Sequence, residues 1–475
     1  MKKIISILLA GVLLLLPLIS CGKTTGDNGQ DSATDTGSVQ ATITELTVDG
    51  VRQNLQNHSI TYTLTGHEVR IPVVAAKKSG GEGELIIRQA TSVPGTATVS
   101  LNGVTYTIML ETDFIYEESK LQNTYRCLAS EKKLNVAYIG GSVTVGAFAD
   151  AGKCFRELTT GWLKEHFDAD ITETNAGIGG TGCFLGAYRT IQHLRLDSET
   201  KRPDLVFIDF AVNDMYDGTS AEDIKCYGET VIREILRSNP YADIVILIVG
   251  EQWSLEREET KAWRELAAYY GLPVVELTQN LLDDIVKEKK SWNAFVADSV
   301  HPNTAGHEKY ASYIANLLQA ELIDKQVSPF RYEEKPLPET TLSPNVMRDL
   351  TFHEAFQLPV SADSGFASQG PDLIDGGIAA AAPGATLTFS FFGTGVSLFL
   401  GDNSGVVVEY SVDGGEFREF KVSDGICPSL ADGLEVGTHK ITLRVKTLPS
   451  GSFFIRRILV RGNTERKNIK ILQNP

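Results

Sequence analysis

Apolar runs alternate with amphipathic stretches over the middle of the chain, from about residue 129 to residue 328. Strand-like apolar runs occupy residues 136–139, 205–212, 244–249 and 274–277. Helical periodicity follows each of them, at residues 155–167, 221–237, 258–270 and 304–322. This alternation predicts an α/β domain of βαβ units, with a parallel sheet buried between helices. Ligands of such sheets bind beyond the carboxyl ends of the strands, so we expect the site there.

Period-two alternation flanks this domain on both sides. Before it, the alternating segments are residues 60–64, 69–73 and 105–109, separated by glycine-containing turns. After it, they are residues 387–391, 396–400, 406–412, 439–445 and 453–460. Such segments are typical of half-buried strands. They predict an immunoglobulin-like (Ig-like) β-sandwich at residues 42–128 and a jelly-roll β-sandwich at residues 345–475, the latter preceded by a proline-punctuated linker at residues 329–344.

The first 41 residues have the pattern of an export signal followed by a tether. Two lysines precede an apolar run at residues 4–19, which is short for a membrane span. The run ends at Ser20-Cys21-Gly22, which resembles the lipobox of bacterial lipoproteins. That resemblance implies removal of residues 1–20 and lipidation of Cys21, and the polar residues 21–41 suit a flexible tether. We therefore expect an exported protein, lipid-anchored at the bacterial cell envelope or cell surface.

Composition narrows the classes of partner. The chain has 44 Lys and Arg against 60 Asp and Glu, a formal net charge of −16, and a pI near 5.1. An acidic surface repels phosphate backbones, which argues against a nucleic-acid partner. The His and Cys residues show no spacing typical of metal ligands. We therefore expect no metal or other cofactor.

Four segments of the α/β domain carry the groups that nucleophilic acyl transfer requires. Ser142 follows a predicted strand through two glycines, which permit a tight turn. Asp298 and His301 stand three residues apart before the last predicted helix, a spacing at which the carboxylate can orient the imidazole and leave its other nitrogen for Ser142. A glycine-rich loop at residues 175–181 offers backbone N–H groups, and Asn213 offers a side-chain amide after a predicted strand.

Together these segments resemble the four sequence blocks of the SGNH hydrolases, also called GDSL esterases, over about residues 134–322. The resemblance implies a flavodoxin-like, three-layer parallel-sheet domain. It also implies that Ser142 is the nucleophile and that His301 and Asp298 complete the catalytic group. The oxyanion hole would consist of the N–H groups of Ser142 and Gly180 and the side-chain amide of Asn213.

The chain departs from the SGNH pattern at two positions. Gly141 stands where the family has Asp before the serine, and Ala211 stands where it has Gly two residues before the asparagine. Neither position carries one of the catalytic groups. An α/β-hydrolase is disfavoured because Thr144, not Gly, stands two residues after the serine.

The C-terminal segments suggest a substrate class. Residues 391–398, 409–415 and 434–443 resemble the jelly-roll module of carbohydrate-esterase family two, although in that family the module usually precedes the hydrolase domain. This resemblance implies removal of O-acetyl groups from a polysaccharide or oligosaccharide, with a C-terminal sandwich that could bind carbohydrate. Trp253 lies at the carboxyl end of a predicted strand, where it could stack on a sugar ring.

Other functions remain compatible with the same scaffold, because a fold does not set the substrate. A general lipase, thioesterase or arylesterase would use the same residues, and so would a glycan O-acetyltransferase. A surface glycan-binding lipoprotein with an inactive hydrolase domain is a further alternative. The sequence leaves the oligomeric state open.

Overall fold

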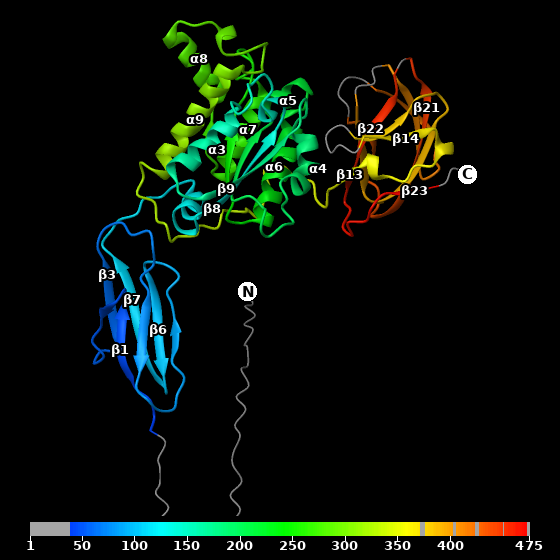
Figure 1. Ribbon diagram of the computed structural model, residues 1–475. Helices are drawn as coiled ribbons and strands as arrows, with labels where there is room; N and C mark the ends of the chain where they lie inside the picture. Colours follow the sequence, from blue (N-terminus) through cyan, green and yellow to red (C-terminus); the bar gives the residue numbers. More distant parts are fainter. Residues whose placement is uncertain (1–38, 371–375, 402–404, 423–426, 450, 473–475) are drawn as a thin grey trace, which may run out of the picture.

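The computed structural model describes residues 39–370, 376–401, 405–422, 427–449 and 451–472, which form three regions in chain order (Figure 1). A β-sandwich precedes the central α/β domain, and a second β-sandwich follows it. The predicted export signal, Cys21 and most of the predicted tether lie outside the described residues. Within the described ranges, no helix is both long enough and apolar enough to cross a membrane.

A five-stranded parallel sheet forms the centre of the α/β domain. In spatial order its strands are β9 (Asp170–Gly177), β8 (Lys133–Gly140), β10 (Leu205–Asp209), β11 (Asp243–Leu247) and β12 (Val274–Val275). Every pairing between neighbours is parallel. This order, with the first strand in second place, is the flavodoxin-like order, and it confirms the expected fold class. The winding reverses between β8 and β10, so a crevice opens at the carboxyl ends of these strands.

Helices cover both faces of this sheet. On one face, α4 (Cys183–His193), α6 (Ala221–Ser238) and α7 (Glu258–Tyr270) contribute buried apolar side chains to one core cluster. On the other face, α3 (Phe155–His166), α8 (Leu277–Glu288) and α9 (Thr304–Leu322) contribute to a second cluster. The remaining α-helices are short: α1 (Gln122–Arg126), α2 (Ser142–Val145) and α5 (Ala211–Tyr216). The domain therefore has the expected three layers.

Three strand predictions in this domain extend past the observed strands, and several elements were missed. The strand expected at residues 244–249 ends at Leu247. The strand expected at residues 205–212 ends at Asp209, and α5 begins at Ala211, so Asn213 lies in a helical turn. The strand expected at residues 274–277 is only β12, because Leu277 already begins α8. Strand β9 was missed because it is an edge strand with many polar residues and no apolar run. Helices α4 and α8 were not predicted either.

The N-terminal sandwich consists of two sheets that enclose a common core. One sheet contains β2 (Val51–Arg52), β1 (Ile43–Val48) and β4 (Val74–Lys78); the other contains β3 (Ser59–Leu64), β7 (Val104–Thr112), β6 (Gly95–Leu101) and β5 (Ile86–Arg88). The strand predicted at residues 69–73 is absent. Val69 and Val73 are 48% and 58% exposed there, and Pro72 has no N–H group to donate, so the alternation does not correspond to burial.

The C-terminal sandwich also consists of two sheets around one core. The first contains β14 (Phe366–Gln369), β15 (Gly377–Ala380), β22 (Phe453–Arg461), β17 (Gly395–Leu400) and β20 (Ser429–Ala431), and β13 (Thr351–Glu354) also pairs with β22. The second contains β19 (Arg418–Lys421), β18 (Val407–Val412), β21 (Gly437–Thr447), β16 (Thr386–Gly393) and β23 (Lys470–Leu472). All five predicted segments fall on strands of these sheets, with shifts of a residue or two at their ends.

The C-terminal sandwich packs on the α4 side of the α/β domain (Figure 1). Met347, Leu350, Phe352, Phe399 and Leu459 belong to the same buried cluster as the helices on that face of the parallel sheet. The ring of His193 at the end of α4 lies edge-on to Phe352, with 5.2 Å between the centroids. One hydrophobic core therefore crosses the boundary between these two domains.

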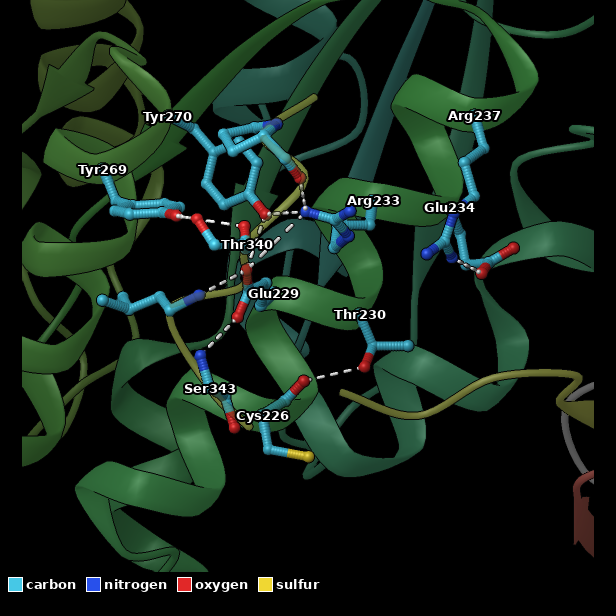
Figure 2. A network of polar contacts seen from close by, with 12 residues as sticks. Cys226, Glu229, Thr230, Arg233, Glu234, Arg237, Tyr269, Tyr270, Thr340 and Ser343 are labelled. Carbon is cyan, nitrogen blue, oxygen red and sulfur yellow. Dashed lines mark hydrogen bonds and ion pairs between the residues drawn. The ribbon is translucent and has the colours of Figure 1, made fainter. Parts of the chain in front are cut away.

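The segment that joins the two domains is fastened to α6 and α7 by hydrogen bonds (Figure 2). At its centre, the fully buried carboxylate of Glu229 accepts hydrogen bonds from the N–H groups of Leu342 and Ser343, at 2.9 and 2.7 Å, and from the Tyr270 hydroxyl, at 2.6 Å. Further hydrogen bonds along the segment join Arg233 to Pro338, Tyr269 to Thr340, Cys226 to Asn345 and Met347 to Thr230. The predicted linker thus holds the second sandwich in one place on the α/β domain.

Replacement of Glu229 by Gln tests this attachment. One amide oxygen cannot replace a carboxylate that accepts three hydrogen bonds, and the amide NH₂ would face other donors. We expect a loss of about 3 kcal/mol in the free energy of unfolding. We also expect faster cleavage between residues 338 and 347 in limited proteolysis. Glu234→Gln on the same helix is the matched control, because within the described part of the chain Glu234 pairs only with Arg237 one turn away (Figure 2). Equal behaviour of the two variants would contradict the attachment.

Candidate active site

A chain of hydrogen bonds joins the predicted catalytic residues. Ser142 begins α2 directly after β8, and its Oγ lies 2.8 Å from Nε2 of His301. Nδ1 of the same imidazole lies 2.7 Å from Oδ2 of Asp298. The second oxygen of Asp298 accepts hydrogen bonds from the backbone N–H groups of Val300 and His301, each at 2.8 Å. The turn before α9 therefore fixes the carboxylate and the imidazole together and aims Nε2 at Ser142.

The charge state of Asp298 suits the role of orienting His301. Although burial raises the pKa of this carboxyl group, the N–H donors of His301 and Val300 outweigh that effect and hold the pKa below its usual value. In contrast, burial raises the pKa of Asp209, at the carboxyl end of β10, and of Asp214, in α5, to about 7. Asp298 is thus ionised at neutral pH, so its carboxylate can accept the Nδ1–H of His301 and hold the ring in one orientation.

The side chain of Asn213 packs against the turn that carries the nucleophile. A Cβ atom at Gly141 would lie 2.0 Å from Oδ1 of Asn213, closer than any two such atoms can stand. Only glycine therefore leaves room for the amide at this position. Glycine in place of the family's Asp at position 141 therefore allows the side chain of Asn213, a predicted oxyanion-hole group, to take this position.

The loop after β9 brings Gly180 to the same place. Gly180 has φ +66°, in the left-handed region that favours glycine, and it lines the cleft at Ser142. Asp214, the neighbour of Asn213, holds this loop: its carboxyl group accepts the N–H of Cys183 at 2.6 Å and the indole N–H of Trp263 at 2.8 Å. The two predicted oxyanion-hole segments are thus joined through one buried side chain.

Buried polar side chains form hydrogen bonds to the strand ends next to Ser142. The fully buried guanidinium of Arg189 on α4 donates to the carbonyl groups of Gly140, at 2.9 Å, and Ala176, at the ends of β8 and β9. The Thr144 hydroxyl of α2 donates to Asp209 at 2.9 Å. Residues on three neighbouring strands are therefore fixed relative to one another before any substrate binds, as preorganised catalysis requires.

The predicted catalytic and oxyanion-hole residues line a cleft of about 320 Å³. Its walls are Ser142, Gly180, Val212, Asn213, Tyr216, Asp217, Asp298, Ser299, Val300 and His301. A second cleft of about 500 Å³ shares Gly180, Tyr216 and Asp217 with the first and extends to Phe399, Cys427 and Ser429 of the C-terminal sandwich. The predicted catalytic residues thus lie at one end of a groove that reaches the next domain.

Trp253, the predicted sugar contact, does not line this cleft. Its indole is 61% exposed and lies beside the guanidinium of Arg257, 5.6 Å from the ring centroid. The exposed aromatic side chain that does line the cleft is Tyr216, which sequence reasoning missed. Its spacing of three residues from Asn213 would have pointed to it once α5 was recognised as a helix, because such residues share a helix face.

Phe148 is a second residue at the site that the sequence did not indicate. Its ring lies 5.4 Å from that of His301, centroid to centroid, and its side chain is 61% exposed. Its φ of 62° is unusual for a bulky residue.

No group of three or more His, Cys, Asp or Glu side chains within the described residues could hold a metal ion. The arrangement provides a nucleophile, a base with an orienting acid, and oxyanion donors, which is the equipment for acyl transfer.

Comparison with known families gives one match. Residues 138–309 match the model of the GDSL-like Lipase/Acylhydrolase family, a range that contains every residue of the hydrogen-bonded chain. No curated protein matches the chain significantly.

Two solved structures of a two-domain esterase share this fold, and others resemble the chain more distantly. A two-domain esterase (CEX) active on acetylated mannans has a TM-score of 0.60 and 22% sequence identity, over 73% of this chain and 97% of that chain. The structure of such an esterase co-crystallized with mannopentaose has a TM-score of 0.58 and the same identity, over 73% of this chain and 94% of that chain. An acetyl xylan esterase, AlAXEase, is 20% identical, covers 39% of this chain and 98% of its own, and has a TM-score of 0.32.

Gly141→Ala tests the packing of Asn213. The added methyl group would displace the amide, and removal of one oxyanion donor costs about 10² to 10³ in kcat. We expect a loss of that order with an aryl acetate, measured by steady-state kinetics. Gly179→Ala is the control, because a Cβ there would lie 3.7 Å from Cβ of Ser142, an ordinary contact. Full activity of the Gly141 variant would show that Asn213 need not occupy this position.

Proposed function

We propose that this chain, whose residues 138–309 match the model of the GDSL-like Lipase/Acylhydrolase family, is an SGNH-type serine esterase that removes O-acetyl groups from a polysaccharide or oligosaccharide. One observation carries this proposal. The hydrogen-bonded chain from Asp298 through His301 to Ser142 opens into a groove that continues to the C-terminal sandwich. Such a groove can admit a chain of sugar residues rather than a single small ester.

The first half of the reaction forms an acyl-enzyme. His301 Nε2 takes the proton of the Ser142 hydroxyl as its oxygen attacks the ester carbonyl carbon. The negative charge on the carbonyl oxygen is stabilised by the N–H groups of Ser142 and Gly180 and by the amide of Asn213. The bond to the sugar oxygen then breaks, His301 returns the proton to that oxygen, and the acetyl group stays on Ser142.

The second half releases acetate. Water gives a proton to His301 and attacks the acetyl-serine carbonyl, the same donors stabilise the second oxyanion, and Ser142 recovers its proton as acetate leaves. Asp298 stabilises the imidazolium in both halves. The side chains of His301 and Asp298 are 27% and 44% exposed. Because water reaches the base directly, hydrolysis is favoured here over transfer of the acetyl group to another acceptor.

The character of the groove supports a carbohydrate substrate. Toward the C-terminal sandwich the groove is lined by the polar side chains of Asp217, Thr219 and Asp223, which suit sugar hydroxyl groups. Farther out, Phe184, Tyr227 and Phe399 provide aromatic faces. The esterase CEX, which shares the fold, is described as active on acetylated mannans. We propose an acetylated mannan or a similar acetylated polysaccharide as the substrate.

The location of the enzyme is a separate part of the proposal. It rests on the lipobox-like segment at Cys21 and on the apolar run before it. A lipid anchor and the polar tether at residues 21–41 would hold the enzyme at the bacterial cell envelope or cell surface. The N-terminal sandwich would then act as a spacer between the membrane and the hydrolase domain, within reach of an immobile polymer.

Release of acetate by wild type and by Ser142→Ala tests this function. We expect wild-type enzyme to release acetate from acetylated glucomannan and from an aryl acetate, and the variant to lose about 10³ to 10⁴ in rate on both. Acetylated xylan in a parallel assay reports how far the enzyme distinguishes between polymers.

Ser312→Ala provides the control. Ser312 lies on α9, and among the described residues its hydroxyl bonds only to the carbonyl of Lys309 in the same helix, so its loss should leave the rates unchanged. Acetate release from the aryl ester alone would contradict the polysaccharide substrate. Equal rates for wild type and Ser142→Ala would contradict the nucleophile.

A further inference from the structure

Tyr216 lies where the two clefts of the groove meet. It is on α5, one helical turn after Asn213, and it is the aromatic residue among the three, with Gly180 and Asp217, that line both the cleft at Ser142 and the cleft that extends to the C-terminal sandwich. Its side chain is 57% exposed, although large aromatic residues are usually well buried. A substrate that runs from the nucleophile toward the second sandwich must therefore pass its ring.

The hydroxyl end of Tyr216 is held from two sides. It donates to a carboxylate oxygen of Glu251, and it lies 3.2 Å from Oγ of Ser299. Glu251 is buried and follows β11, while Ser299 stands between the catalytic Asp298 and His301. Burial and the neighbouring Glu251 raise the pKa of Tyr216, so the phenol stays neutral. These contacts fix the exposed ring without occupying its faces.

We propose that Tyr216 is the platform on which the acetylated sugar ring packs, a role that rests on the proposed function. Pyranose rings present C–H groups on one face, and an aromatic ring of fixed orientation receives them at little cost in side-chain entropy. The hydroxyl bridge from Glu251 to Ser299 sets the distance between this platform and the loop that carries the base. Tyr216 thus selects sugar esters over simple esters and presents the acetyl carbonyl to Ser142.

The substrate dependence of this role separates it from a structural one. A ring that only supports the loop of Asp298 and His301 would affect every ester equally, because both reactions need the same base. A ring that contacts the sugar affects only the ester that contains one. An aryl acetate therefore reports the integrity of the catalytic residues, and an acetylated manno-oligosaccharide reports the platform.

The experiment compares Tyr216→Leu and Tyr216→Phe with wild type in the full chain, on p-nitrophenyl acetate and on acetylated mannopentaose. We expect Tyr216→Leu to lower kcat/KM on the oligosaccharide about tenfold, mainly through KM, and to change it less than threefold on the aryl ester. Tyr216→Phe keeps the ring and loses its hydrogen bonds, so it should fall between Tyr216→Leu and wild type on the oligosaccharide. Tyr241→Leu is the control, because Tyr241 is an exposed aromatic residue just before β11. It therefore lies at the amino end of the parallel strands, and the cleft lies at their carboxyl end.

Three results would overturn the platform. Equal losses of Tyr216→Leu on both substrates would assign the residue to support of the catalytic loop, and undiminished oligosaccharide activity would show that the sugar does not contact it. The third result is cleavage of only the aryl ester by the wild-type enzyme. This result would contradict the proposed function as well as the platform, and it is seen with the wild-type enzyme before any variant is compared. If Tyr216→Leu has lost its fold, which a fallen thermal midpoint would show, Tyr216→Phe decides by the same comparison.

Discussion

The hydrogen bond between Ser142 and His301 is the contact on which the rest of the site depends. It joins two ends of the α/β domain that are 159 residues apart in sequence. The parallel sheet makes this contact possible, because it brings the carboxyl ends of β8, β9 and β10 to one end of the domain. Helix α9, which follows His301, packs on the same face of the sheet as α2, which begins at Ser142. An error of an ångström in either segment would separate the base from the nucleophile.

Buried polar groups hold that edge in place. Arg189 binds the carbonyl ends of β8 and β9, Thr144 binds Asp209, and Asp214 joins the Gly180 loop to the segment of Asn213. Each would be costly if left without a partner, so these side chains admit few alternative arrangements. The buried carboxylate of Glu229 likewise fixes the segment that leads to the C-terminal sandwich. The second domain is thereby held where its Phe399 completes the groove.

The sequence predicted the α/β domain well, because apolar strands are local signals. The Ser, Asn and Asp-x-x-His segments are local signals too, and they indicated the candidate catalytic residues. The structure brings Ser142, Gly180, Asn213, Asp298 and His301 to a single cleft. Trp253 and Tyr216 mark the limit of such reasoning. Both follow strands at the same edge, and only the path of each loop in three dimensions decides which one reaches the cleft. Strand β9 was missed because an edge strand need not have an apolar periodic pattern. The hydrogen bonds of Glu229 to residues 342 and 343 were missed because pairing between distant parts of the chain leaves no local pattern.

Covalent labelling of the nucleophile tests the central claim most directly. An alkyl fluorophosphonate reacts with a serine hydroxyl that a neighbouring base activates, and peptide mass spectrometry locates the adduct. The hydrogen-bonded chain predicts a single adduct on Ser142 in wild-type enzyme, and loss of that adduct in His301→Ala. A labelled serine elsewhere, or equal labelling of Ser142 without the imidazole, would contradict the assignment of the active site.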